Sequence, residues 1–111
     1  MKGDLAYLQH IAEAIADIEN YLKGLSQEEF LREKMIQDAV LRKLEIIGEA
    51  TKRLSEKIRK SHTAIPWKDV AGMRDKLIHD YLGVDLDEVW FTLQHDLPKL
   101  KDELQRIRKE Q

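Results

Sequence analysis

Residues 33–60 read EKMIQDAVLRKLEIIGEATKRLSEKIRK, a stretch without proline that predicts one long helix, set off from a short helical segment by a pause near Leu31. Apolar residues recur on it at helical spacing and form one stripe: Val40, Leu44, Ile47, Leu54 and Ile58. A second apolar stripe, rotated from the first, comprises Met35, Ala39, Ile46 and Ala50. A helix that is apolar on two sides packs on two sides. We therefore expect this helix to lie at the centre of a bundle or to be shared with a second chain, and Gly48 indicates a close backbone neighbour.

The residues on the N-terminal side of this stretch predict another helix. Apolar residues at helical spacing cover residues 4–23, with Asp4 as the expected N-cap and Gly24 as the C-terminal stop. Ser26 and Glu29 have the spacing of a capping box, so a new helix is expected to begin there.

The C-terminal half contains two more predicted helices, separated from the long one by a loop over residues 61–65. Pro66 is placed as an N1 proline that opens a helix from Trp67 to about His79. Residues 85–88 resemble a second capping box, and an unbroken apolar stripe follows over residues 86–107. Pro98 is expected to kink or split that last helix. The sequence thus predicts one all-α domain, residues 1–111, built as an antiparallel bundle of four or five helices.

The composition excludes several classes of function. The chain has no cysteine, so it contains no disulfide, thiolate nucleophile or cysteine zinc site. It also has no apolar run near the roughly 18 residues that a membrane span needs and no signal-peptide core. The metalloprotease pattern H-E-x-x-H and a glycine-rich phosphate loop are both absent. We expect a cytoplasmic protein with no cofactor, no metal and no membrane partner.

The formal net charge of −2 hides an uneven distribution. Residues 51–79 contain eight basic and three acidic residues, a net charge of +5, which leaves −7 for the remainder of the chain. A basic segment of this kind suits a phosphodiester substrate. The alternative is that these lysines and arginines only solvate a helix face, the usual meaning of such a run.

The strongest candidate site is the segment MRDKLIHDY, residues 73–81. Arg74, His79 and Tyr81 bring a guanidinium, an imidazole and a phenol to the end of the predicted helix. Asp75 precedes His79 by four residues and is within pairing reach, and with the helix-end carbonyls it favours the imidazolium. Arg74 and His79 lie roughly 140° apart around a helix. Either the helix end unwinds, or a second copy of the chain completes the site.

The remaining candidates are weaker. His10, His62 and His95 are interpreted as surface or satisfied histidines, because none has a second ligand at a convincing spacing. Asp80 and Glu49 are auxiliary candidates only. Glu49 has an ordinary alternative, an ion pair with the residue four positions later, Arg53.

Three segments of the chain resemble the HepT-like toxins of the HEPN superfamily. Residues 74–81, RDKLIHDY, match the R-x4-H-x-Y motif of that family. Residues 46–50, IIGEA, are similar to its segment on the long helix, and Pro66-Trp67 followed by VAGMR at residues 70–74 is similar to the lead-in to its motif. The resemblance covers nearly the whole chain, from Ser26 to Pro98.

The resemblance implies a homodimeric bundle that acts as a metal-independent endoribonuclease and as the toxin of a toxin–antitoxin system. Arg74 and His79 would be the catalytic pair. Tyr81 would receive AMP from the antitoxin, a minimal nucleotidyltransferase (MNT). In cleavage by the RNA 2′-hydroxyl, His79 would move protons, as acid or base, and Arg74 would stabilise the phosphorane.

Two alternatives stay open at the level of sequence. The first is a non-catalytic HEPN binding partner of a nucleotidyltransferase, which would keep the helices and Tyr81 but lack nuclease activity. The second is a purely structural dimerisation bundle, in which replacing Arg74 would have no effect.

Overall fold

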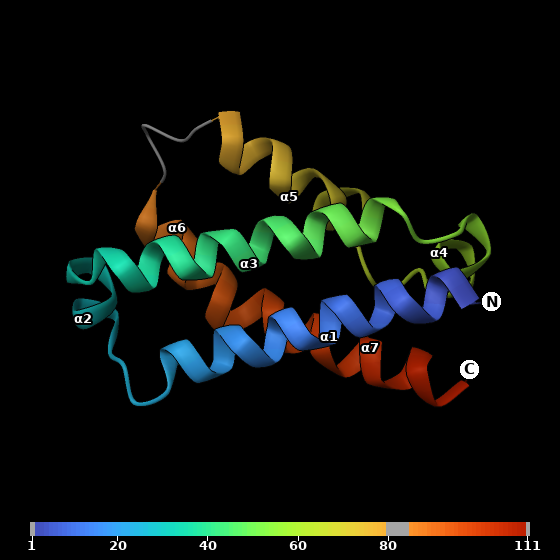
Figure 1. The fold of residues 1–111 in the computed structure, drawn as a ribbon, viewed down its shortest axis with the longest axis horizontal. Coiled ribbons are helices and arrows are strands. Elements are labelled where there is room, and N and C mark those ends of the chain that lie inside the picture. The colour runs from blue at the N-terminus through green and yellow to red at the C-terminus, as the bar shows by residue number, and fades with distance from the viewer. Residues whose placement is uncertain (1, 80–84, 111) are drawn as a thin grey trace.

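The computed structural model describes the backbone of residues 2–79 and 85–110 and the side chains of residues 3–73 and 85–110. Every element in these ranges is helical (Figure 1). The elements are α1 (Lys2–Leu22), α2 (Gln27–Arg32), α3 (Lys34–Lys52), α4 (Glu56–Ser61), α5 (Trp67–His79), α6 (Leu86–Phe91), a π-helical turn (Thr92–Asp96) and α7 (Leu97–Glu110). The predicted all-α class is confirmed.

The long helices are arranged as an antiparallel bundle. Figure 1 shows α1 and α3 side by side and running in opposite directions, with α5 packed along α3 and α7 along α1. The helix α6, the π-helical turn and α7 follow one another without a break and return the chain to the end where α1 begins. The short helices α2 and α4 lie at opposite ends of α3. The helix α3 therefore occupies the central position that its two apolar stripes predicted.

The two stripes of α3 differ in burial. Every member of the first stripe is buried, and Val40 and Ile47 are fully enclosed; Leu54 and Ile58 lie beyond the end of α3, in the connection to α4 and on α4. In the second stripe Ala50 is buried and Ala39 and Ile46 are half-buried, whereas Met35 is 85% exposed. Gly48 is also buried. The described chain therefore packs on all of one side of α3 and on only part of the other.

The prediction that one helix runs from residue 33 to residue 60 is wrong at its C-terminal end. The helix stops at Lys52, and Ser55 is the N-cap of a separate helix, with its Oγ accepting from the Ile58 backbone N–H at 3.3 Å. In a continuous α-helix the Ser55 N–H would donate to the carbonyl of Thr51. It donates instead to the Asp4 carboxylate, at 2.8 Å, and this bond draws the backbone out of the helical path.

Asp4 is also not the N-cap that the sequence predicted. The first helix begins at Lys2, so Asp4 lies inside it, and its side chain is only 4% exposed. The carboxylate accepts from both the backbone N–H and the hydroxyl of Ser55, the latter at 2.7 Å. A buried carboxylate needs such donors, and here they come from a residue distant in the sequence.

Other local predictions are confirmed. Gly24 ends the first helix with φ +75°, and Ser26 and Glu29 form the reciprocal capping box. The predicted pause appears at Glu33, which separates α2 from α3. Asp85 caps α6 by accepting from the N–H groups of Asp87 and Glu88, at 3.0 and 3.1 Å.

The kink expected at Pro98 takes the form of a widened turn. The π-helical turn ends immediately before α7, and the Leu97 N–H donates to the carbonyl of Thr92, five residues earlier. Pro98 has no N–H to donate and its ring crowds the preceding carbonyls. The wider turn relieves this crowding, so the helix bends but does not break.

No helix in residues 2–79 or 85–110 combines the length and the apolar character needed to cross a membrane.

Candidate functional site

The helix α5, which carries the motif, is anchored at its N-terminal end. The Pro66 carbonyl accepts from the Val70 N–H at 3.1 Å, so Pro66 lies just before the helix and not at its first position. Trp67 is 8% exposed, and its Nε1 donates to the His62 carbonyl at 2.9 Å. Val70 is buried as well, so the start of α5 is held by both packing and a hydrogen bond.

The backbone of α5 is helical without interruption from Trp67 to His79. Arg74, Asp75 and His79 therefore all lie on this helix, and their side chains are outside the described residues. Because the helix does not unwind before His79, the positions of Arg74 and His79 lie roughly 140° apart around its axis. Asp80 and Tyr81 lie outside the described residues altogether.

The helix α3 is the neighbour of the motif helix. It packs along α5, and Glu49 lies half-buried on it, next to the buried Gly48. Glu49 is therefore carried by the helix that packs along α5.

The other three histidines each contact another side chain. His10 is exposed and meets the ring of Tyr7 edge to face at 6.1 Å. The His62 side chain is only 12% exposed, with Nε2 3.1 Å from a Glu110 carboxylate oxygen. His95 is exposed and stacks against Phe91 at 4.2 Å. These contacts agree with the interpretation of the three as surface or satisfied histidines.

Among the residues with described side chains, no three His, Asp or Glu residues form a group that could hold a metal ion. A cavity of about 240 Å³ lies between the second half of α1 and the π-helical turn, where Ile18, Leu93 and Pro98 line it. The residues that line this cavity do not include any from α5, so it is separate from the motif helix.

Two features of the structure escaped prediction from the sequence. The contact of Asp4 with Ser55 joins residues too far apart for any spacing rule to suggest. Arg59 is half-buried, and its Nε is enclosed without a hydrogen-bond acceptor among the described residues. It lies on α4, and the helical periodicity of the sequence does not separate α4 from α3.

Comparison with protein families gives a match to the family described as Ribonuclease HepT-like, over residues 11–107. The match includes the whole segment from Arg74 to Tyr81.

Three relatives illustrate the similarity. The chain is 48% identical to the probable ribonuclease HepT of Thermococcus cleftensis, over 93% of this chain and 94% of the relative. It is 41% identical to a protein of Caldanaerobacter subterraneus subsp. tengcongensis that is named as an RNase, over 96% of both chains. It is 48% identical, over 94% of its own length, to a Methanocaldococcus jannaschii protein named as a gamma-glutamylcyclotransferase and RNase, but it spans only 47% of that protein. No solved structure matches the chain.

Proposed function

The chain belongs to the HepT-like ribonuclease family. From this premise we propose that it is a metal-independent endoribonuclease and the toxin of a cytoplasmic toxin–antitoxin system. Its match to the family over residues 11–107 and the complete R-x4-H-x-Y motif at residues 74–81 support the proposal.

The observation that carries the proposed site is the uninterrupted helix α5. With Arg74 and His79 roughly 140° apart on one straight helix, a single copy does not direct both positions to the same phosphodiester. A two-fold axis beside α5 would bring Arg74 of one copy toward His79 of the other, so the working unit is a homodimer. The exposed part of the second stripe of α3 is consistent with a partner chain.

The proposed reaction is transphosphorylation. The RNA 2′-oxygen attacks the adjacent phosphorus, the bond from phosphorus to the 5′-oxygen breaks, and a 2′,3′-cyclic phosphate and a 5′-hydroxyl result. His79 transfers a proton, either from the 2′-hydroxyl or to the leaving oxygen. Arg74 stabilises the extra negative charge on the phosphorane. Asp75, four residues before His79, is a positioning residue for the imidazole, and Asp80 and Glu49 are auxiliary candidates.

Silencing of the toxin is proposed to occur at Tyr81. The phenolic oxygen attacks the α-phosphate of ATP bound by an MNT antitoxin, pyrophosphate leaves, and the tyrosine becomes AMPylated. The added phosphate is negatively charged and lies close in sequence to His79 and Arg74, so it would repel an anionic substrate.

Mixing two inactive variants tests the shared site. We expect Arg74→Ala and His79→Ala each to reduce RNA cleavage in EDTA by a factor of roughly 10² or more. If Arg74 and His79 of different copies form each site, mixed dimers contain one intact site. Co-refolding the two variants should then recover about a quarter of the wild-type rate.

The readout is cleavage of a fluorescently labelled RNA, with the 2′,3′-cyclic end identified by mass spectrometry. A wild-type protein that cuts no RNA would contradict the proposed activity. Full loss in the mixture, with dimers present by sedimentation, would contradict only the shared site.

A further inference from the structure

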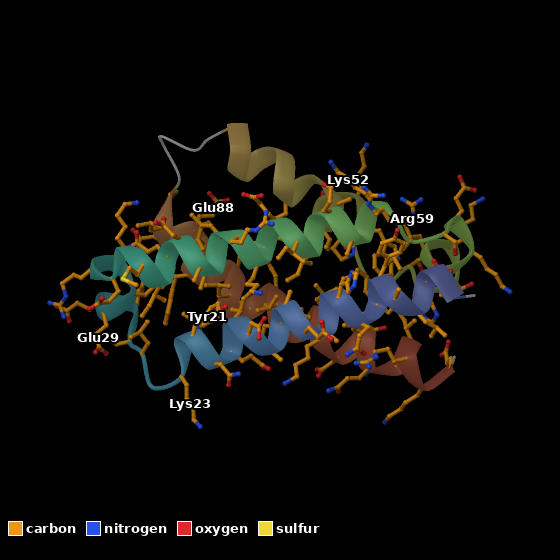
Figure 2. All side chains as sticks on the ribbon, in the orientation of Figure 1. Tyr21, Lys23, Glu29, Lys52, Arg59 and Glu88 are labelled. Carbon is orange, nitrogen blue, oxygen red and sulfur yellow. The ribbon has the colours of Figure 1, made fainter. Side chains whose placement is uncertain are left out.

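Figure 2 shows Lys52 and Arg59 in the same half of the molecule, where α3 ends and α4 begins. The basic residues of this region are Lys52, Arg53, Lys57, Arg59, Lys60 and Lys68, and together they are called the basic end. We propose that the basic end binds the phosphate backbone of single-stranded RNA at a distance from the site of cleavage. The proposal rests on the ribonuclease function and adds to it a second binding surface on the same chain.

The first support is that several of these cations are not neutralised by the protein. Arg53, Lys57 and Lys68 are exposed and have no ion pair within residues 3–73 and 85–110. Lys60 contacts Glu56 at 3.5 Å, but both side chains are nearly four-fifths exposed, so this pair contributes little. Cations elsewhere in the chain more often contact a carboxylate, as do Arg32, Lys34, Arg42, Lys43, Lys101 and Arg106.

The second support is the environment of Arg59. The side chain is half-buried, and its Nε is enclosed by protein atoms without an acceptor among the described residues. Packing around Nε therefore restrains the guanidinium, and no carboxylate among the described side chains forms an ion pair with it. A planar guanidinium restrained in this way can hold a phosphate with a smaller loss of side-chain entropy than a mobile lysine.

The position of α4 is itself fixed by tertiary contacts. The N-cap residue of α4, Ser55, is held by the buried Asp4 carboxylate through its N–H and its hydroxyl. This network connects the first helix to the helix that carries Lys57, Arg59 and Lys60. The residues of the basic end on α4 are consequently held in a fixed position by the fold.

The surface is distant from the motif. The helix α5 begins in the same half as the basic end and leads away from it toward His79 (Figure 1). Its 13 residues span about 20 Å at 1.5 Å per residue. Lys68, the member of the basic end on α5, lies six residues or about 9 Å before Arg74, whereas the members on α4 lie at the end of the bundle away from His79 (Figure 1). An RNA that contacts both α4 and the cleaved bond must therefore extend beyond the nucleotides at that bond, and a tetranucleotide makes fewer of these contacts.

The chemistry favours a polyanion over a protein partner. Among the described side chains, the exposed large apolar ones are Leu5, Tyr21, Leu31, Met35 and Phe91, and none of these lies in residues 51–73. Protein interfaces usually have an apolar centre with few charges. The exposed lysines and arginines of residues 52–68 have no such centre beside them in that stretch, and their positive charges suit a nucleic-acid backbone.

The test compares two double variants with equal loss of charge. Arg53→Gln/Lys57→Gln alters the basic end, and Lys23→Gln/Lys99→Gln alters two exposed lysines elsewhere, of which Lys23 lies at the opposite end of the molecule (Figure 2). Each pair is made in the full chain, both with His79 intact and with His79→Ala. Binding of a 20-nucleotide single-stranded RNA is measured by fluorescence anisotropy at several salt concentrations. Cleavage is measured on that RNA and on a tetranucleotide.

We expect the basic-end variant to bind the long RNA about tenfold more weakly, with a slope of log affinity against log salt smaller by about 1.4, since two phosphate contacts are lost. The control variant should match the parent protein. Cleavage of the long RNA at limiting concentration should fall with binding, while cleavage of the tetranucleotide should stay unchanged. Arg59→Gln should weaken long-RNA binding, and Arg59→Lys should restore only part of it.

Each other outcome has a definite meaning. Equal binding by the basic-end and control variants would overturn the inference, as would an equal loss of cleavage on the long RNA and the tetranucleotide. Polyglutamate serves as a model of an acidic protein. If the basic-end substitutions weakened its binding and left RNA binding intact, the surface would be assigned to an acidic protein partner, and the inference would be overturned. Absence of cleavage by the parent protein, with the binding difference present, would contradict the proposed nuclease activity and leave the RNA-binding inference supported.

Discussion

The two ends of the bundle use their charges differently. At one end, residues 27–38 and 85–88 carry seven acidic and two basic residues, and this region is called the acidic end. There Glu29 and Asp85 accept backbone N–H groups at helix starts, and Asp38 contacts Lys34. At the basic end, Arg53, Lys57 and Lys68 make no ion pair with a described residue. Charges at the acidic end therefore help to complete the fold, whereas these three exposed cations of the basic end are available to a ligand.

The ends also differ in the polar contacts that hold them. The acidic end is closed by the Phe30 ring packed on Trp90 at 5.3 Å, by caps between residues two or three positions apart, and by one exposed hydrogen bond between distant residues, from Gln27 Nε2 to the Asp87 carboxylate at 3.0 Å. The basic end is held by polar contacts between distant residues, Asp4 with Ser55 and His62 with Glu110. The comparison therefore suggests one test at each end, an apolar substitution at the acidic end and a polar substitution at the basic end.

The largest expected effect is at the acidic end. Phe30 is fully buried, so Phe30→Ala should lower the free energy of unfolding by about 3–5 kcal/mol. Phe91→Ala is the matched control, because Phe91 is 57% exposed and should change stability by about 0.5 kcal/mol or less. Urea denaturation at one fixed protein concentration measures both. Similar losses for the two variants would show that packing of Phe30 does not hold this end.

The next effect is at the basic end. Asp4→Ala removes the acceptor for the Ser55 N–H and hydroxyl and should lower the free energy of unfolding by about 1.5–3 kcal/mol. Because Ser55→Ala breaks part of the same network, the double variant should lose less than the sum of the single variants. Strictly additive losses in a double-mutant cycle would show that the two residues act independently.

The smallest expected effect concerns a cap at the acidic end. Ser26→Ala should cost about 1 kcal/mol of stability. The hydrogen bonds from the Ser26 backbone N–H and then the Ser26 side chain hold the pKa of Glu29 below its usual value. Because the pKa of Glu29 is lowered in the folded state, its ionised carboxylate stabilises the fold above the unfolded pKa of about 4.3. This stabilisation is lost as the pH falls through the folded pKa.

Titration of the Glu29 carboxyl group by NMR measures its pKa directly. The pKa of Glu29 should rise toward its ordinary value in Ser26→Ala and stay low in Glu28→Gln, a neighbouring change that leaves the cap in place. An unchanged Glu29 pKa in Ser26→Ala would show that the backbone N–H alone is responsible.

Much of the fold was predictable because it depends on near neighbours. Each of the confirmed local features involves residues within about five positions of one another. These features are the helix end at Gly24, the caps at Ser26 and Asp85, the start of α5 after Pro66 and the π-helical turn before Pro98. The motif positions Arg74 and His79 were found in the same way, on a helix whose predicted bounds are confirmed.

The sequence by itself determined the helical class, the caps and the family motif, because periodicity and local hydrogen bonds are set by residues adjacent in the chain. Tertiary structure alone decided where α3 ends, because the acceptor that stops it, Asp4, comes from a helix that begins 53 residues before Ser55. It also decided that Arg59 is half-buried, with an Nε that has no acceptor among the described residues. Burial and partnership are properties of the packed bundle, so no spacing rule along the chain could supply them.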